Sequence, residues 1–339
     1  MKDYGVLVGV GDCLDELSSL CLTCGIEEVG RITQNIKEID VTYYIGRGKV
    51  DEVKELVNRA KANVVVFDVE LSGSKVRNLE SILSVPVLDR SKIILDIFAG
   101  RAQSMEGKLQ VELAQLKYNM PRLVRSRGNM AQMKNAVGMR GPGEKKLELD
   151  KRKIRDEIAE LERKIKKLKE TRTQNKKLAA KGGKSRVCLV GYTNSGKSTL
   201  LNTMAKAGVL AEDKLFATLD PKTANVYVDG VQFLLTDTVG FIDKLPHEFI
   251  HAFESTLDET RNADLLLHVI DFSNEKYKEQ MQIVHDVLDK IGAGNIPRIL
   301  VFNKIDMMRI IDKEFDGVYI SAKTRKNLEE LWTLLKETL

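Results

Sequence analysis

Short apolar runs alternate with amphipathic segments over the first hundred residues of the chain. The runs that predict buried strands lie at 6–10, 63–69 and 86–89. The segments that predict helices lie at 12–24, 48–61 and 74–84. In the second of these, Val50, Val53 and Val57 recur at helical spacing, and we expect Gly25 to cap the first. The alternation predicts a small, mostly parallel α/β domain over residues 1–103.

A pair of amphipathic helices is expected next, over residues 104–180. Apolar residues step by three and four along both, at Leu109, Leu113, Leu116, Ile154, Ile158, Leu161, Ile165 and Leu168. Such seams predict that helices over about 104–120 and 147–176 pack as an antiparallel hairpin. We expect Pro121 to end the first helix, because proline lacks a backbone donor and clashes with the preceding turn.

The connector between these helices, residues 122–146, is basic and rich in glycine, so we expect it to be mobile. It lies in a segment, 121–184, that holds 21 Lys and Arg against 8 Asp and Glu, while the remainder holds 33 against 41. This concentration favours a polyanionic partner. A solvated helix face, or a loop packed on the chain's own acidic segments, also explains it. The candidate contacts are Arg122, Arg125, Arg127, Lys134, Arg140, Lys145 and Lys146.

Residues 185–339 follow an expected linker at 181–184 and predict a doubly wound α/β domain, with ligand at the carboxyl ends of its strands. The expected strands lie in the runs SRVCLVG, YVDGVQFLLTD, DLLLHVID, PRILVFN and GVYISA, and a final helix is expected over 324–338. The fold class is therefore α/β, with an N-terminal α/β domain, a helical hairpin and a doubly wound domain.

The first strand of this domain runs into a phosphate-loop pattern and then an apolar helix. The residues are Gly191, Tyr192, Thr193, Asn194, Ser195, Gly196, Lys197, Ser198 and Thr199. Glycines allow consecutive N–H groups to face phosphates, and the helix N-terminus adds a favourable dipole. We expect Lys197 to reach the β- and γ-phosphates and Ser198 to ligate Mg²⁺.

Three further motifs follow in the order that a GTPase requires. They are Asp237-Thr238-Val239-Gly240, Asn303-Lys304-Ile305-Asp306 and Ser321-Ala322-Lys323. Asp237 can approach Mg²⁺, and the Gly240 N–H can meet the γ-phosphate. The Asp306 carboxylate can accept both N–H donors of the guanine edge, and an amide of the last motif can meet the guanine carbonyl. The sequence therefore predicts GTP binding.

A switch segment lies between the phosphate loop and the second motif, at Phe216, Ala217, Thr218, Leu219 and Asp220. Thr218 is the candidate switch threonine, which would make Ser198, Thr218 and Asp237 the Mg²⁺ ligands. Lys197, Thr218, Gly240 and Asn194 form the candidate catalytic set. Asn194 is also a candidate K⁺ ligand, because it resembles the K⁺-binding asparagine of several cation-dependent GTPases, although such a residue can simply satisfy loop amides.

The chain resembles the HflX family of the translational GTPase superfamily over nearly all its length. The resemblance rests on YYIGRGKVDEV (43–53), EGKLQVELAQLKYNMPRL (106–123), GMRGPGEKKLELDKR (138–152), FATLDP and DTVGFIDKLPHEFIHAFESTLDE. It implies three parts, over 1–103, 104–180 and 185–339, and binding of the large ribosomal subunit and its RNA. In some members it implies splitting of stalled ribosomes.

The chain departs from the family pattern in two places. Met139 and Lys145 stand where members often carry threonine, which puts the contacts of the connector in doubt. The chain also ends soon after its expected last helix, so we expect it to lack the small C-terminal domain of many bacterial members.

Three other motifs have weaker chemical interpretations. His247-Glu248-Phe249-Ile250-His251 matches the HExxH zinc-protease pattern, but it follows Gly240 where a GTPase has its second switch, which favours chance. Cys21 and Cys24 form a CxxC pair without further ligands at suitable spacing, which favours buried thiols over a redox pair or a metal site. Gly46-Arg47-Gly48-Lys49 could cradle a phosphate, but a tight turn before a helix explains it more simply.

Composition and single residues narrow the class of protein, its compartment and its partners. Hydrophobic residues at 43% and charged residues at 30% predict a globular chain, and few cysteines predict a reducing cytoplasm. We expect a monomer that binds GTP and GDP, does not bind DNA and has no transmembrane segment; peripheral membrane association stays open. Hydrolysis should be slow in isolation, because Phe241 stands where many GTPases place a water-orienting glutamine. A nucleotide-gated RNA-binding module with incidental hydrolysis is the alternative, and Asp306 argues against an ATP-driven enzyme.

Overall fold

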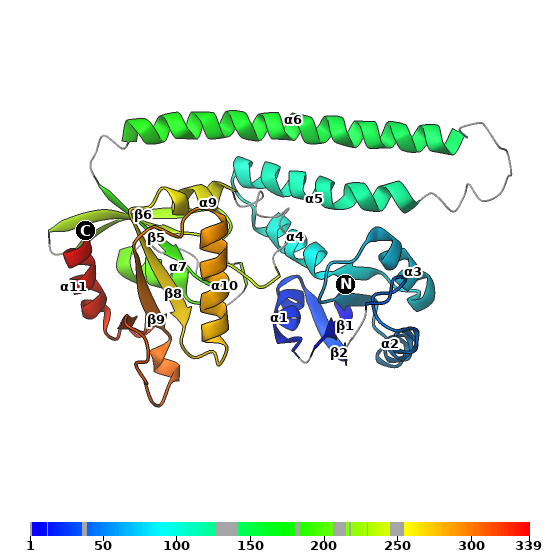
Figure 1. The fold of residues 1–339 in the computed structure, drawn as a ribbon, viewed down its shortest axis with the longest axis horizontal. Coiled ribbons are helices and arrows are strands. Elements are labelled where there is room, and N and C mark those ends of the chain that lie inside the picture. The colour runs from blue at the N-terminus through cyan, green and yellow to red at the C-terminus, as the bar shows by residue number, and fades with distance from the viewer. Residues whose placement is uncertain are drawn as a thin grey trace. The chain divides into compact units, whose positions relative to one another are not determined.

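The computed structural model describes residues 2–11, 13–35, 39–126, 142–179, 184–205, 215–216, 218–228, 230–244 and 254–339. Its backbone divides into two compact units. The first contains Met1–Gly100 and Leu109–Ile165, and the second contains Arg101–Lys108 and Lys166–Leu339. Each unit is built around its own sheet (Figure 1). The predicted boundaries of three domains stay a prediction.

The first unit contains a four-stranded parallel sheet in the order β2-β1-β3-β4. Its strands are β1 (Asp3–Val10), β2 (Ile26–Gln34), β3 (Val64–Phe67) and β4 (Val87–Asp89). The helices that connect them are α1 (Asp15–Thr23), α2 (Arg47–Ala60) and α3 (Gly73–Leu83), and α4 (Arg90–Arg101) follows. Val50, Val53 and Val57 of α2 are buried in the same core as the sheet valines. The predicted parallel α/β architecture is confirmed.

The pattern of apolar residues did not reveal β2 or α4. Strand β2 lies at the sheet edge and carries charges, among them Arg31, whose guanidinium lies 2.6 Å from Glu28 and 2.9 Å from Asp15. Helix α4 is buried around much of its circumference, including Ile93, Leu95 and Phe98. An edge strand without an apolar run and a helix without a polar face both lack the periodicity on which prediction depends.

Helices α5 (Met105–Ser126) and α6 (Pro142–Ala179) pack together through the parts of them that belong to the first unit (Figure 1). Leu113, Leu161 and Ile165 are buried in one cluster. Lys117 Nζ lies 2.8 Å from Glu162 of α6, and Met120 lines one cavity with Lys151 and Arg155 of α6, so higher residue numbers on α5 meet lower ones on α6. The predicted antiparallel pairing is confirmed for residues 109–126 and 142–165. The central part of the connector, 127–141, lies outside the described residues.

The expectation that Pro121 ends its helix is wrong, since α5 continues to Ser126. Arg122 stabilises the turn that contains the proline. Its guanidinium donates to the carbonyl oxygens of Tyr118 (2.8 Å) and Leu71 (2.6 Å) and to the carboxylate of Asp89 (2.8 Å). Tyr118 donates its hydroxyl to the same carboxylate at 2.7 Å. These tertiary contacts on both sides of Pro121 outweigh the local penalty, which is about 3 kcal/mol.

The second unit contains a six-stranded sheet in the order β10-β9-β8-β5-β7-β6, in which only the β6–β7 pair is antiparallel. The strands are β5 (Ser185–Val190), β6 (Lys222–Val228), β7 (Val231–Asp237), β8 (Leu265–Asp271), β9 (Arg298–Asn303) and β10 (Val318–Tyr319). The helices are α7 (Lys197–Ala205), α9 (Glu254–Arg261), α10 (Tyr277–Lys290), α11 (Leu328–Thr338) and a short 3₁₀ helix, η4 (Ile305–Met307).

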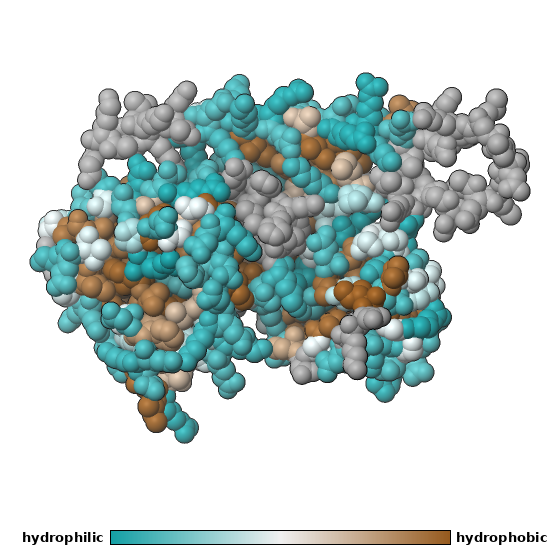
Figure 2. Space-filling model, in the orientation of Figure 1, coloured by the Kyte–Doolittle hydropathy of each residue, from teal (hydrophilic) through white to brown (hydrophobic). Residues whose placement is uncertain are grey.

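The predicted nucleotide motifs lie at the carboxyl ends of strands in this sheet. The run YVDGVQFLLTD contributes to two strands, because Gly230 turns the chain at φ +92° between β6 and β7. The last residues of β5, β7, β9 and β10 precede or belong to the predicted nucleotide motifs, which is the carboxyl-end arrangement of doubly wound folds. The face in Figure 2 is largely hydrophilic. Within the described ranges, no helix has the length and apolar character needed to cross a membrane.

Candidate nucleotide site

The phosphate loop connects the carboxyl end of β5 to the N-terminus of α7 through a backbone that requires glycine at two positions. Gly191 lies so close to β8 that a Cβ would stand 2.2 Å from the Val269 carbonyl oxygen. Gly196 has φ +94°, and its Cβ would stand 2.2 Å from Asn303 Nδ2. Asn194 also has a positive φ, +59°, which asparagine tolerates better than most residues. The backbone therefore has the tight curvature that phosphate binding requires.

Lys197 begins α7 and is buried. Its Nζ donates to the carbonyl oxygens of Gly191 (3.1 Å) and Tyr192 (2.7 Å). Burial lowers the pKa of Lys197 to about 8, against the opposing charge of Asp237. A buried ammonium beside a helix N-terminus is an unfavourable state that an anionic ligand would relieve.

Ser198, Thr218 and Asp237 bring their oxygens together from three different segments. The Ser198 and Thr218 hydroxyls donate to Asp237 Oδ2 at 2.6 Å and 2.7 Å, and the two hydroxyl oxygens are 2.9 Å apart. Asp237 Oδ1 is buried without a hydrogen-bond partner. Burial raises the pKa of Asp237, in spite of the charge of Lys197. A set of hard oxygen donors with one buried oxygen unsatisfied fits a divalent cation such as Mg²⁺.

The segment that follows β7 pairs with the phosphate loop. Phe241 donates its N–H to Gly191 at 3.1 Å and accepts from the Thr193 N–H at 2.7 Å. Thr238 donates its hydroxyl to the Leu189 carbonyl at 2.6 Å. A Cβ at Gly240 would lie 2.8 Å from Thr193 Cα, so this segment approaches the loop as closely as backbone allows. Phe241 and Val239, on either side of Gly240, are buried.

Asn303, at the end of β9, connects the phosphate loop to the last motif. Its amide donates to the Ser195 carbonyl at 2.9 Å and accepts from the Ala322 N–H at 2.9 Å. Lys304 follows with φ +66°, and its Nζ lies 2.8 Å from Asp271 at the end of β8. Asp306 is exposed on η4. This arrangement leaves the Asp306 carboxylate accessible to a guanine edge.

The sequence did not indicate Asp271 as a residue of this site, and it did not indicate a role for the side chain of Tyr192. Asp271 holds Lys304, and its signal was a carboxylate at the end of the buried run DLLLHVID. The Tyr192 hydroxyl accepts from the Asp243 N–H at 2.9 Å, which nothing in the motif indicates.

The other predicted nucleotide residues are placed as follows. Buried side chains belong to Thr193, Ser195, Phe216, Thr218, Leu219, Thr238, Ile305, Ser321 and Ala322. Thr199 and Asp220 are half-buried and Lys323 is exposed. Asp220 contacts the start of α5, not the loop. Ala217 lies outside the described residues. The roles assigned to these residues stay predictions.

The structure describes only some of the residues that are predicted to contact a polyanion. Arg122 is held by Asp89 and Leu71, as described above. Arg125, Lys145 and Lys146 lie in described helix backbone without described side chains. Arg127, Lys134 and Arg140 lie outside the described residues. Their role stays a prediction.

The weaker motifs give no second site in the parts of the chain that are described. His247, Glu248 and His251 lie outside these parts, and within them no cluster of His, Cys, Asp and Glu could hold a metal. Burial raises the pKa of the Cys21 thiol to about 12 and also raises that of Cys24, so both thiols stay protonated and weakly nucleophilic at neutral pH. Gly46 precedes α2 in an extended conformation, and its N–H bonds to Gln34.

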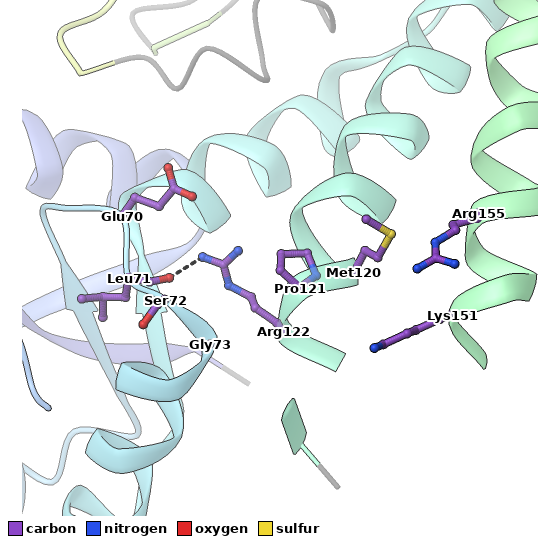
Figure 3. Close-up of a pocket in the computed structure, with 9 residues that line it drawn as sticks. All are labelled: Glu70, Leu71, Ser72, Gly73, Met120, Pro121, Arg122, Lys151 and Arg155. Carbon is purple, nitrogen blue, oxygen red and sulfur yellow. Dashed lines mark hydrogen bonds between the residues drawn. The ribbon is translucent and has the colours of Figure 1, made fainter. Parts of the chain in front are cut away.

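The first unit contains a cavity of about 770 Å³ beside the N-terminus of α3. Figure 3 shows Arg122 pointing across it to the Leu71 carbonyl, with Lys151 and Arg155 entering from α6. Glu70 and Met120 also line it. The cavity contains none of the predicted nucleotide residues.

Comparison with known proteins identifies the family. Three family models match in succession: "GTP-binding GTPase N-terminal" over residues 12–99, "GTP-binding GTPase Middle Region" over 101–178 and "50S ribosome-binding GTPase" over 186–304. The GTPase HflX of Caldanaerobacter subterraneus subsp. tengcongensis is 46% identical over 346 residues, which cover 100% of this chain and 81% of that protein. The chain belongs to the HflX family of GTPases. This membership makes it a GTP-hydrolysing enzyme.

Other relatives agree with this assignment. The HflX of Escherichia coli strain K12 is 43% identical over 335 residues, which cover 96% of this chain and 79% of that protein. A GTP-binding protein from the archaeon Sulfolobus solfataricus, solved in complex with GDP, has a TM-score of 0.53 and 23% identity, with 99% of this chain and 98% of that chain covered. At that identity the likeness concerns the fold. The fold of this HflX family member is therefore similar to that of the archaeal protein.

Proposed function

We propose that this HflX family member is a Mg²⁺-dependent GTPase whose nucleotide state controls its binding to the large ribosomal subunit. The observation that carries the metal dependence is the convergence of the Ser198 and Thr218 hydroxyls on Asp237 Oδ2, while the other oxygen of this carboxylate, Oδ1, is buried and unsatisfied. These three residues would hold Mg²⁺, directly or through water. When bound, Mg²⁺ neutralises charge that develops on the phosphate oxygens.

The residues of the site then divide the reaction among them. Water attacks the γ-phosphorus of GTP, the bond to the β,γ-bridging oxygen breaks, and GDP and phosphate form. Lys197 stabilises the negative charge on the phosphates, and the Gly240 N–H faces the γ-phosphate. Phe241 is buried and cannot orient water, so turnover of the isolated protein is slow and the ribosome stimulates it. Asn194 would ligate K⁺, which contributes charge that an arginine finger supplies elsewhere.

The ribosomal partner is supported by the family and by charge. One matching family model is described as a 50S ribosome-binding GTPase, and segment 121–184 holds 21 Lys and Arg against 8 Asp and Glu. Clustered cations bind RNA phosphates with release of counterions. Binding leads to dissociation or rescue of stalled ribosomes. We further propose a cytoplasmic monomer with GTP, GDP and ribosomal RNA as its ligands.

Sedimentation with isolated ribosomal subunits tests this proposal. Protein loaded with a non-hydrolysable GTP analogue should pellet with the large subunit, and protein loaded with GDP should stay in the supernatant. Equal pelleting in both states, or pelleting with the small subunit alone, would contradict it.

The second candidate is a nucleotide-gated RNA-binding module, which the apolar Phe241 favours. GTP turnover with and without ribosomes separates the two. No stimulation by ribosomes, together with nucleotide-dependent pelleting, would support the module.

A further inference from the structure

Asp220, two residues beyond the switch threonine, contacts the N-terminus of α5 inside the second unit. Its Oδ2 accepts from the backbone N–H groups of Gln103 (2.9 Å) and Ser104 (2.8 Å), and its Oδ1 bonds to the Ser104 hydroxyl. Ser104 in turn accepts from the Gly107 N–H at 2.9 Å. The switch segment thus supplies a carboxylate where a helix N-terminus attracts negative charge.

The contact between Asp220 and α5 requires glycine at position 107. A Cβ at Gly107 would lie 2.7 Å from Asp220 Oδ1 and 3.0 Å from Ser104 Oγ. Any larger residue at this position would displace the carboxylate. Gly107 lies in the first turn of α5, where glycine lowers helix stability relative to other residues. This loss of helix stability is accompanied by the close approach of Asp220.

The same segment is anchored on its other side at the proposed metal site. Thr218 is buried and bonds to Asp237 at 2.7 Å, and Lys222 pairs with Asp237 in the β6–β7 ladder. Leu219, between Thr218 and Asp220, is buried as well. The three residues from Thr218 to Asp220 therefore join two anchors, and a shift of either anchor must move the other.

A second set of contacts at the first turn of α5 consists of ion pairs. Arg172 of α6 lies 3.5 Å from Glu106 and 2.6 Å from Glu259 of α9, and all three side chains are mostly buried. These residues also belong to the second unit. The start of α5 is thus bonded directly to the segment before β6, through Asp220, and indirectly to α9, through Arg172.

We propose that Asp220 is a positioning residue for the GTPase reaction. It ties the Thr218 segment to the N-terminus of α5, so that Thr218 reaches its metal-binding position when the Asp220–α5 bonds are formed. This inference rests on the proposed function, since it needs Thr218 as a ligand. It adds that GTP with Mg²⁺ strengthens the bonds at Gln103 and Ser104, and that displacement of the start of α5 slows hydrolysis.

Hydrogen exchange of the full-length protein tests the link directly. With Mg²⁺ and a non-hydrolysable GTP analogue, the amides of Gln103 and Ser104 should exchange about tenfold more slowly than with GDP, because ligand-induced ordering deepens protection. Thr218→Ala should abolish this nucleotide difference although Asp220 and α5 are unchanged. A cap that is only structural would keep the same exchange in both nucleotide states, and that result would overturn the proposal.

Single-turnover kinetics provide the second measurement. Asp220→Ala should lower the hydrolysis rate about tenfold or more, since small misplacements of catalytic groups are costly. Adding Asp220→Ala to Thr218→Ala should cause little further loss. Asp312→Asn, which changes an exposed carboxylate of the same unit, is the control with unaltered rate. Additive losses would overturn the proposal. Failure of the wild-type protein to bind GTP, measured by fluorescent-nucleotide titration, would instead refute the proposed function.

Discussion

Lys197 shows at the scale of one residue how the fold prepares the site for a ligand. The folded protein holds this ammonium among carbonyl oxygens with its pKa lowered to about 8. An unfolded lysine titrates near 10.4, so between these two values the unfolded chain binds more protons. The free energy of unfolding must then rise with pH across this window, and the burial cost is fully present below pH 8.

A pH series on the nucleotide-free protein tests this. From pH 7 to pH 10, the unfolding free energy of the wild type should increase by about 2 kcal/mol more than that of Lys197→Met. Urea denaturation of both proteins at the two pH values measures the difference. The methionine variant cancels the contribution of other titrating groups, and parallel pH dependence of the two proteins would rule out a depressed Lys197 pKa.

Asp306 is the residue that we expect to recognise the guanine base. Asp306→Asn should weaken GTP binding by about 2–3 kcal/mol, because it leaves mismatched hydrogen bonds at the base. The xanthine nucleotide, which exchanges a donor for an acceptor, should bind the variant better than it binds the wild type. Titration with both nucleotides measures this, and unchanged GTP affinity would remove Asp306 from the site.

Asn194 controls the proposed K⁺ dependence. Initial hydrolysis rates should be higher in KCl than in NaCl at equal ionic strength, and Asn194→Ala should remove the difference. Because Asn194 has φ +59°, Asn194→Gly is the better-matched variant, since glycine adopts this backbone without strain. Equal rates of the wild type in the two salts would exclude the K⁺ role.

At the scale of elements, α5 depends on the tertiary contacts around Pro121. Asp89 is fully buried and accepts from Arg122, Tyr118 and the Leu71 N–H. Removal of one partner from a buried ion pair leaves an uncompensated charge. Arg122 is therefore required for the stability of the first unit, whether or not it also contacts RNA.

Arg122→Met should lower the unfolding free energy of the first unit by about 3 kcal/mol. Lys117→Met, on the same helix, removes a half-exposed pair with Glu162 and should cost less than about 1 kcal/mol. Hydrogen exchange of the β4 and α3 amides under increasing denaturant measures both. If the two variants lose equal stability, the Arg122–Asp89 contact contributes little and Arg122 is available for a partner.

At the scale of the whole molecule, we expect partner recognition and GTP binding to depend on different parts of the chain. Replacement of residues 127–141 by a short Gly/Ser linker leaves the described parts of α5 and α6 and the nucleotide motifs intact. GTP affinity should be unchanged, while co-sedimentation with ribosomes and ribosome-stimulated turnover should be lost. Binding by the intact protein should weaken steeply with salt. Full ribosome binding by the variant would place recognition outside the connector.

The nucleotide motifs and most elements were predictable from local pattern. The four motifs could be found because each consists of specific residue types within a few positions of one another, and each follows a predicted strand. The α2 valines and the α5–α6 seam also follow from helical spacing. In each case the information lies within a short stretch of chain, so no distant contact was needed to interpret it.

Contacts between distant segments decided the rest. Strand β2 exists because it pairs with β1, and α5 passes Pro121 because Arg122 and Tyr118 bond to Asp89. The bond between Asp220 and the start of α5 joins residues more than a hundred positions apart. The sequence around Asp220 and around Ser104 does not indicate this bond. A carboxylate and a helix N-terminus attract each other only at short range, and the tertiary fold decides whether they are close.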